Sequence, residues 1–249
     1  MRVLVTRPRE DGEKLADVLG TRGIEVLLEP LLCVEYLEGP GLDLDGVQAL
    51  VVTSANGLRA FARRDSRRGL PVYAVGDASA QAAAEAGFSR IISAAGDIEA
   101  LARLICERID PAKGALLHAS GTVVAGDLGG VLAAAGLTYR RQVLYRANQA
   151  KSLSAAVVRA LRAGVVDGVL FFSPKTATIF VILIRKADLE YGCGEMTAFC
   201  LSPAVAETAR TLTWLHLLVA SRPDQDAMVE AIESHRVLIE NGGGRGWRT

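Results

Sequence analysis

The sequence is poor in the residues that build metal sites and disulfide frameworks. It has four cysteines, at positions 33, 106, 193 and 200, and three histidines among 249 residues. No two cysteines form a CxxC pair, and no histidine lies at the spacing of a metal ligand. We therefore expect neither a zinc site nor a set of structural disulfides.

The sequence also lacks net charge and long apolar runs. Its 28 Lys and Arg residues balance 28 Asp and Glu residues, which argues against a surface that coats nucleic acid, although local basic clusters stay open. The longest apolar run, Ile179–Ile184, is too short to cross a bilayer. At the N-terminus charge returns at Arg7, unlike in a secretory signal. These absences predict a cytoplasmic protein without nucleic-acid or membrane partners.

Short β-branched runs alternate with Ala-rich helical stretches along the whole chain, half of which is hydrophobic. This alternation is typical of α/β proteins whose parallel sheets are covered on both faces. The predicted strands are Arg2–Val5, Ile24–Glu29, Ala49–Thr53, Val72–Val75, Arg90–Ile92, Ala115–His118, Thr138–Leu144, Gly168–Phe172, Met196–Leu201 and Leu215–Val219. A last helix is predicted from Asp224 to His235.

An internal repeat organises these elements. Ser54 and Phe61 recur as Ser173 and Phe180 at an offset of 119 residues, and matching segments before and after them keep the same order. The chain therefore reads as two copies of a five-stranded Rossmann-like or flavodoxin-like unit. The alternative is that all βα units share such patterns.

Small and hydroxyl-bearing residues follow the predicted strands. In open α/β sheets ligands bind at the carboxyl ends of the strands, so these positions are the candidate binding residues. Each could simply cap the next helix, but together they offer hydroxyls and helix N-termini to an anionic ligand. The candidates are Thr6, Arg7, Thr53, Ser54, Asn56, Gly76, Ser120, Ser173 and Ser202.

Several common motifs are missing. The sequence has no GxGxxG, GxxxxGK[ST], GxSxG or HExxH pattern and no acidic pair after the first strand. The sequence therefore lacks the usual motifs of nicotinamide chemistry, nucleotide hydrolysis, acyl transfer and metalloprotease activity. What is left is an enzyme that needs no cofactor, or a binding protein.

The strand-end segments together resemble the uroporphyrinogen-III synthase family. The resemblance spans roughly residues 1–235 and is strongest in VLVTRP at the N-terminus and VVTSANG at Val51–Gly57. It also includes PLL at Pro30–Leu32, AVG at Ala74–Gly76, VLY at Val143–Tyr145 and FFSP at Phe171–Pro174. One departure is visible, because Ser202 and Pro203 stand where the family usually has a Gly-containing turn followed by Thr-Ala.

The resemblance implies that one domain is inserted into the other. The first domain would comprise residues 1–34 and 149–235, the second residues 36–146, and residues 236–249 would form a flexible tail. Two crossings, Cys33–Leu37 and Leu144–Asn148, would form an antiparallel hinge ribbon. The repeat by itself would also allow a tandem division near Pro111.

The resemblance also implies an activity: closure of the linear tetrapyrrole hydroxymethylbilane to uroporphyrinogen III, with loss of water and inversion of ring D, by a monomer without a cofactor. Tyr145 matches the candidate acid for the departing hydroxyl. A phenol has an ordinary pKa of about 10 and can donate a proton at neutral pH. Tyr145 could instead anchor a domain boundary. Arg9 and Arg146 are expected at a solvated rim, and His118 as a satisfied strand-end residue.

Two other functions stay open from the residues alone. The chain could be a two-lobed binding or sensor protein that closes around a small anion without catalysis. It could also be a cofactor-free lyase or transferase of another polyanionic substrate.

Overall fold

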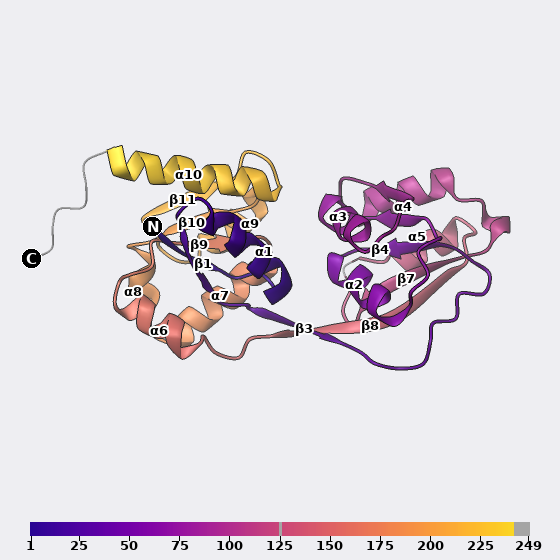
Figure 1. The fold of residues 1–249 in the computed structure, drawn as a ribbon, viewed down its shortest axis with the longest axis horizontal. Helices are drawn as coiled ribbons and strands as arrows, with labels where there is room; N and C mark the ends of the chain where they lie inside the picture. The colour runs from indigo at the N-terminus through magenta and orange to yellow at the C-terminus, as the bar shows by residue number, and fades with distance from the viewer. Residues whose placement is uncertain (125, 242–249) are drawn as a thin grey trace, which may run out of the picture. The chain divides into compact units, whose positions relative to one another are not determined.

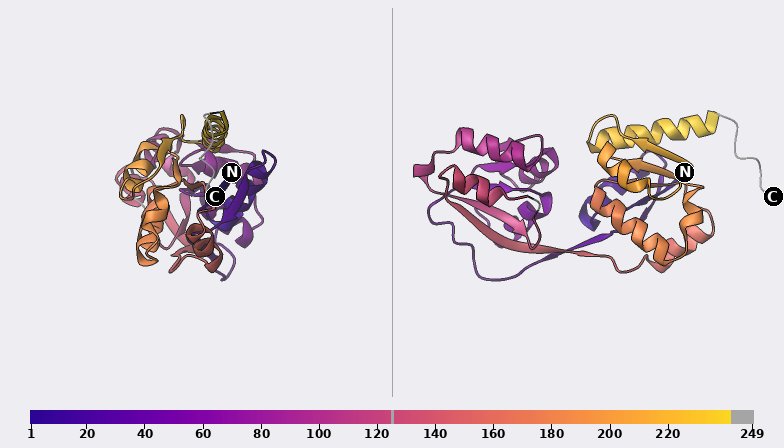
Figure 2. Two further views of the ribbon diagram at one scale, coloured as in Figure 1. Left: turned by 90° about the vertical axis from the view of Figure 1, so that its left-hand side faces the viewer. Right: turned by 180° about the vertical axis from the view of Figure 1, so that it is seen from behind.

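The computed structural model describes residues 1–124 and 126–241, which form two compact units. The first unit comprises Met1–Cys33 and the chain from Asn148 onward, and the second comprises Val34–Ala147. Figure 1 labels the helices and strands, and Figure 2 gives two further views in which each unit has helices on both faces of its sheet. The α/β fold with parallel sheets that the alternation predicts is confirmed.

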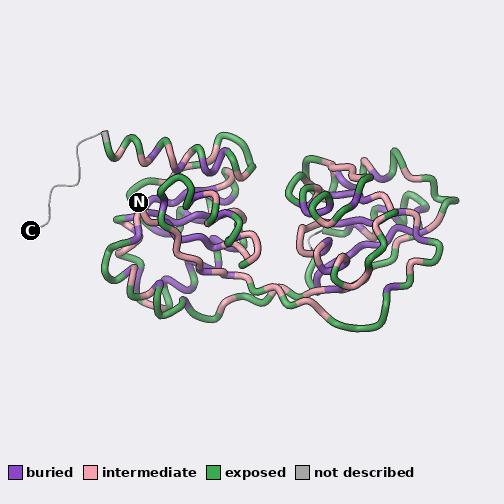
Figure 3. Tube along the Cα trace, in the orientation of Figure 1, coloured by how far each residue is buried: buried purple, intermediate pink, exposed green. Residues whose placement is uncertain are grey.

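The first unit contains a fully parallel sheet in the order β11-β10-β9-β1-β2. Its strands are β1 (Arg2–Val5), β2 (Glu25–Leu28), β9 (Gly168–Phe171), β10 (Thr197–Cys200) and β11 (His216–Val219). Its helices are α1 (Arg9–Gly20), α6 (Ala155–Arg162), α7 (Pro174–Lys186), α8 (Glu190–Cys193), α9 (Pro203–Ala209) and α10 (Gln225–Asn241). The central strands are almost entirely buried (Figure 3).

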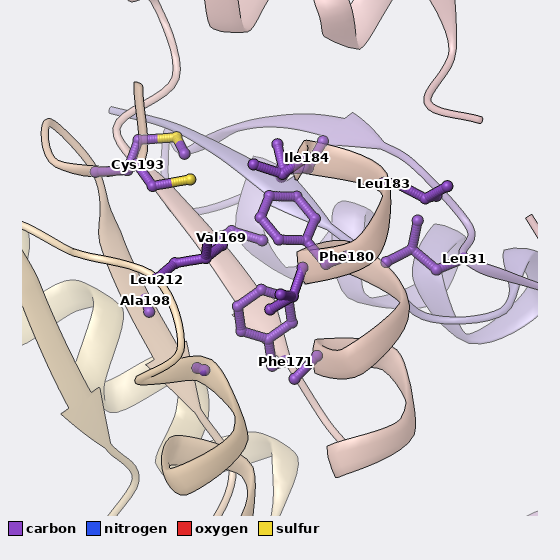
Figure 4. Packing of buried hydrophobic residues seen from close by; sticks show 14 of the residues in the cluster. Leu31, Val169, Phe171, Phe180, Leu183, Ile184, Cys193, Ala198 and Leu212 are labelled. Atoms are coloured by element: carbon purple, nitrogen blue, oxygen red, sulfur yellow. The ribbon is translucent and has the colours of Figure 1, made fainter. Parts of the chain in front are cut away.

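Alternation along the strands divides the first core into two layers. Val3 and Val5 of β1 pack with α1 and α10, whereas Leu4 between them packs with α7 on the other face. This is the two-residue period of a strand, which sends successive side chains to opposite faces. In the layer under α7, the rings of Phe171 and Phe180 meet edge to face with centroids 5.2 Å apart (Figure 4).

The second unit has a six-stranded sheet in the order β3-β8-β7-β4-β5-β6. Its strands are β3 (Leu32–Tyr36), β4 (Val47–Val52), β5 (Val72–Ala74), β6 (Ile91–Ser93), β7 (Ala115–Gly121) and β8 (Tyr139–Gln149). Helices α2 (Ala55–Arg64) and α3 (Asp77–Glu85) cover one face, and α4 (Ile98–Arg108) and α5 (Leu128–Ala134) cover the other. A 3-10 turn, η1, spans Pro111–Lys113.

The sixth strand, β3, corresponds to the predicted crossing Cys33–Leu37 and is added to the five strands expected in the sheet of this unit. The amide of Leu37 donates to the carbonyl of Leu144 (2.8 Å), and the amide of Ala150 donates to the carbonyl of Leu31 (3.0 Å). Residue numbers rise along β3 as they fall along β8, so the two strands are antiparallel. The chain passes from one unit to the other along β3 and returns along β8.

Helix α10 continues six residues beyond the predicted end at His235, so residues 236–241 are helical and not part of a tail. His235 is buried with its Nε2 2.8 Å from the Thr197 hydroxyl. The next turn is held by Arg236, which donates to the carbonyl of Arg22 (2.7 Å) and pairs with Glu240 four residues on. The rest of the predicted tail, residues 242–249, lies outside the described residues. Within residues 1–124 and 126–241, no helix combines the length and apolarity that a bilayer crossing requires.

Helix α2 lies so close to β7 that one glycine is required between them. A Cβ atom on Gly57 would fall 2.3 Å from the carbonyl oxygen of Ala119. We expect Gly57→Ala to lower the free energy of unfolding by about 1–3 kcal/mol, as overpacking does. The measurement is urea unfolding followed by circular dichroism.

The matched control is Gly69→Ala in the same unit, whose Cβ would meet no atom within 4 Å. Its effect should stay within about 0.5 kcal/mol. Equal losses in the two variants would show that the approach of α2 to β7 is not the constraint.

Candidate functional site

The structure places the predicted site residues at the carboxyl ends of two separate sheets. In the first unit, Thr6 and Arg7 follow β1, Ser173 follows β9 and Ser202 follows β10. In the second unit, Thr53 and Ser54 follow β4, Asn56 lies in the first turn of α2, Gly76 follows β5, Ser120 lies in β7 and Tyr145 lies in β8.

Three hydroxyl-bearing residues lie at the strand ends of the first unit, and two of them bond to the local backbone. Thr6 is fully buried, and its hydroxyl donates to the carbonyl of Leu170 (2.7 Å). Ser173 caps α7 by accepting from the amide of Thr176 (3.2 Å). Ser202 precedes α9, and its side chain makes no capping hydrogen bond. Of these three hydroxyls, that of Ser202 is therefore the one not committed to a cap or a strand contact.

Arg7 is the cation at this edge of the first sheet. Its guanidinium donates to Gln225 (2.9 Å), lies 3.6 Å from the carboxylate of Asp11 and stacks over the ring of Phe172, 4.4 Å from its centroid. Three partners hold the group in one orientation at the end of β1. Arginine suits carboxylate recognition because its planar fork can donate two parallel hydrogen bonds.

The other two arginines considered from the sequence lie in exposed ion pairs. Arg9 is 3.3 Å from Glu13, and Arg146 is 3.6 Å from Glu35. About half or more of each of these side chains is exposed. Such pairs contribute little to stability, and their positions agree with the expected rim.

Two candidates of the second unit that are distant in sequence touch each other. The phenolic oxygen of Tyr145 lies 2.8 Å from the Ser54 hydroxyl oxygen, across 91 residues of chain. Ser54 also caps α2 by accepting from the amide of Gly57 (3.1 Å). The ring of Tyr145 lies against Gly121, where a Cβ atom would fall 2.8 Å from the ring carbon that bears the hydroxyl. The phenol is therefore held from two sides.

A second chain of contacts runs inward from Thr53. Its hydroxyl is 3.0 Å from Nε2 of His118, and Nδ1 of His118 is 2.5 Å from the hydroxyl of Tyr139. His118 is 1% exposed, and burial, with a smaller contribution from Arg141, lowers its pKa to about 4. Burial also raises the pKa of Tyr139. The imidazole is thus neutral at pH 7, with one N–H, so it donates to one neighbour and accepts from the other.

Ser120 lies inside a strand, although the sequence predicted an open loop from residue 119. Strand β7 continues to Gly121 because β8 runs beside it, with Ser120 opposite Val143. Ser120 is buried, donates to the carbonyl of Gln142 (3.3 Å) and accepts from the guanidinium of Arg141 (3.0 Å). Its hydroxyl therefore bonds to groups of β8 at the end of β7 and does not lie in a loop.

Asn56 and Gly76 lie where helices begin. The side-chain amide oxygen of Asn56, in the first turn of α2, accepts from the guanidinium of Arg59 (3.4 Å). The backbone carbonyl of Gly76 accepts from the amides of Ser79 and Ala80 (both 3.1 Å), which starts α3. The N-terminus of a helix carries free amides and a partial positive charge, so α2 and α3 favour anionic groups at this edge.

A hollow of about 630 Å³ between α4 and α5 does not suit an anion. Three carboxylates, Asp97, Glu99 and Asp127, line it together with Arg103. In the part of the chain that is described, no group of three His, Cys, Asp or Glu side chains could hold a metal ion. The strand ends present hydroxyls, backbone amides, the Arg7 guanidinium and the buried imidazole of His118.

Sequence reasoning missed three residues of the second unit: Gly121, Tyr139 and Arg141. Tyr139 and Arg141 lie two positions apart in β8, so both side chains face the same side of the sheet. The sequence shows this alternation at the start of the strand. It identifies site residues only once β7 is known to lie beside β8.

Comparison with known proteins gives consistent results. A family model described as uroporphyrinogen-III synthase HemD matches residues 13–230. A search of curated proteins finds no match. Among solved structures, the chain is similar to uroporphyrinogen-III synthetase from Helicobacter pylori 26695, with 16% identity, coverage of 95% of this chain and 100% of that chain, and a TM-score of 0.62.

It is also similar to a mutant uroporphyrinogen III synthase from the extremely thermophilic bacterium Thermus thermophilus, with 16% identity, coverage of 96% of this chain and 99% of that chain, and a TM-score of 0.57. At these identities the structures establish the fold, and the family match rests on the sequence model.

The buried His118 predicts a loss of stability in acid. Its pKa of about 4 lies below the ordinary 6.5, so the unfolded state takes up this proton first as the pH falls. The stabilisation is complete above pH 6.5 and is lost between pH 6.5 and about 4, by up to about 3 kcal/mol. Urea unfolding at several pH values measures how the free energy of unfolding changes with pH.

His118→Gln removes the titrating group. The free energy of unfolding of this variant should therefore change less between pH 6.5 and about 4 than that of the unaltered protein. An NMR titration tests the cause directly. An imidazole of His118 that gains its proton near pH 6.5 in the folded protein would contradict the prediction.

Proposed function

The chain belongs to the uroporphyrinogen-III synthase family, and on that premise we propose that Tyr145 donates the proton with which the reaction begins. The family match, which covers most of the chain, is the observation that carries the function. The activity is that of uroporphyrinogen-III synthase in tetrapyrrole biosynthesis, and hydroxymethylbilane is the substrate that the family implies.

The chemistry requires a departing hydroxyl and a steered ring closure. Tyr145 gives its phenolic proton to the hydroxymethyl oxygen, the C–O bond breaks with its electron pair on that oxygen, and water leaves. Electrons of the attached pyrrole stabilise the resulting cationic carbon as an azafulvenium ion. The substituted carbon of ring D attacks it, and the spiro intermediate fragments and recloses with ring D inverted. The proton lost when the last pyrrole regains aromaticity returns to the phenolate.

The position of Tyr145 supports this role. Its side chain is partly exposed at the sheet edge, and its phenolic oxygen contacts the neutral hydroxyl of Ser54. General acids of this kind contribute about 10²–10⁴-fold to a rate.

The remaining candidates would hold the polycarboxylate substrate. We assign direct contacts to Thr53, Asn56 and the amides after Gly76 in the second unit, and to Arg7, Ser173 and Ser202 in the first. Thr6 and Ser120 are buried, so in this proposal they fix the strand ends from which the contacts are made. Most donors are neutral, which agrees with a chain that has no net charge.

Holding the substrate bent is the main task in this proposal, since an unguided chain closes without inverting ring D. Restricting a flexible reactant to a reactive pose can lower a barrier by roughly 7–11 kcal/mol at most. We infer that the protein performs this task in the cytoplasm, as a monomer and without a cofactor.

The expected product decides the function. Incubated with freshly generated hydroxymethylbilane, the protein should yield the type III isomer, separated from type I by chromatography. Formation of only the type I isomer, the spontaneous product, would leave a binding protein as the function.

Tyr145→Phe removes the phenolic proton and keeps the ring. We expect kcat for type III formation to fall about 10- to 1,000-fold, within or just below the usual range for acid–base groups. Arg9→Ala is the matched control, because that exposed residue lies in an ion pair at the rim. Unchanged turnover in Tyr145→Phe would remove the phenol from the mechanism.

A further inference from the structure

The contact between Ser54 and Tyr145 gives Ser54 a different role from that of a substrate ligand. The Ser54 hydroxyl has one proton to donate, and its oxygen already accepts from the amide of Gly57 (3.1 Å). Its proton can therefore point to the phenolic oxygen, 2.8 Å away. In that arrangement the proton of Tyr145 is not used within this pair and is available to the substrate.

We propose that Ser54 is a positioning residue for Tyr145: its hydroxyl donates to the phenolic oxygen, frees the phenolic proton for the leaving hydroxyl and stabilises the phenolate once that proton has left. This inference rests on the proposed role of Tyr145. A hydrogen bond to a charged acceptor is stronger than one to a neutral acceptor, so the contact gains strength as the proton moves.

The backbone reinforces the same placement. Ser54 is the N-cap of α2, whose ten residues direct the positive end of their dipole toward the cap. The phenolic oxygen, which becomes negative, lies next to that end. On the other side of the ring, the missing side chain of Gly121 leaves the room that the phenol occupies.

The main chain of Tyr145 is also fixed at this point. The amide of Thr122 donates to its carbonyl (3.0 Å), and Gly121 lies opposite it in the β7–β8 ladder. A Cβ at position 121 would fall 3.1 Å from the phenolic oxygen itself. Any larger residue there would push the hydroxyl away from its present position beside Ser54.

A double-mutant cycle tests the proposal. The activity of type III formation is measured for the unaltered enzyme, Ser54→Ala, Tyr145→Phe and the double variant. We expect Ser54→Ala to lower kcat about tenfold while KM changes less than about twofold, and to have less than about a twofold effect when Tyr145 is already Phe. The proposal would be overturned if the fold-changes in kcat of the two single substitutions multiply in the double variant. It would also be overturned if Ser54→Ala raises KM and leaves kcat unchanged.

The cycle separates this inference from the proposed function. If Tyr145→Phe alone leaves kcat unchanged, the proton-donor role fails. If Tyr145→Phe lowers kcat but Ser54→Ala lowers it equally in both backgrounds, the phenol keeps its role and only the positioning role of Ser54 fails.

Capping is separated from donation by two further substitutions. Ser54→Thr keeps both functions and should restore kcat to within about threefold of the unaltered enzyme. Ser54→Asp keeps a good cap but offers the phenol an acceptor in place of a donor, so its kcat should fall at least as far as that of Ser54→Ala. Full kcat in Ser54→Asp would contradict the proposal.

Ser154→Ala is the control for folding. Ser154 is exposed and caps α6 in the first unit by accepting from the amide of Val157 (3.3 Å). It should lower the melting temperature about as much as Ser54→Ala does and leave kcat unchanged. A comparable loss of kcat in Ser154→Ala would attribute the effect of Ser54→Ala to stability and overturn the proposal.

Discussion

The pairing of β8 with β7 is the constraint on which the candidate site of the second unit depends. Strand β8 lies between β7 and β3, parallel to the first and antiparallel to the second. Its hydrogen bonds extend β7 to Gly121. The register shifts by one residue between Ser120 and Gly121, and beyond this irregularity Tyr145 lies opposite Gly121 and beside Ser54. A further shift by one residue would turn the phenol to the other face of the sheet, because side chains alternate along a strand.

Serine hydroxyls at the strand ends both cap helices and contact other side chains. Ser54 and Ser173 occupy equivalent places, each the N-cap of the helix that follows a central strand, and each accepts from the third residue of its helix. A cap fixes the side chain at the sheet edge and orients its lone pairs. In the second unit this fixed hydroxyl also meets the phenol of Tyr145, whereas Ser173 contacts the hydroxyl of Thr176 (3.1 Å). The two units are thus chemically different at these two N-caps.

Much of the fold was predictable because its signals are local. The alternation of strands and helices, the family and the α/β architecture follow from the sequence and are confirmed. Errors arose where an element is stabilised by a distant neighbour. Strand β7 runs past His118 because β8 pairs with its end, and α10 runs past His235 because Arg236 reaches the carbonyl of Arg22. Neither partner lies near in sequence, so no local pattern marks these extensions.

The sequence by itself determined which residues stand at the ends of the strands, since hydrophobic periods and capping residues act over a few positions. The tertiary structure alone decided how those residues are used. It buried Thr6 and Ser120, made His118 a neutral link between Thr53 and Tyr139, and joined Ser54 to Tyr145 across 91 residues. Such contacts depend on the register between strands far apart in the chain, and register is set by the packing of the whole sheet.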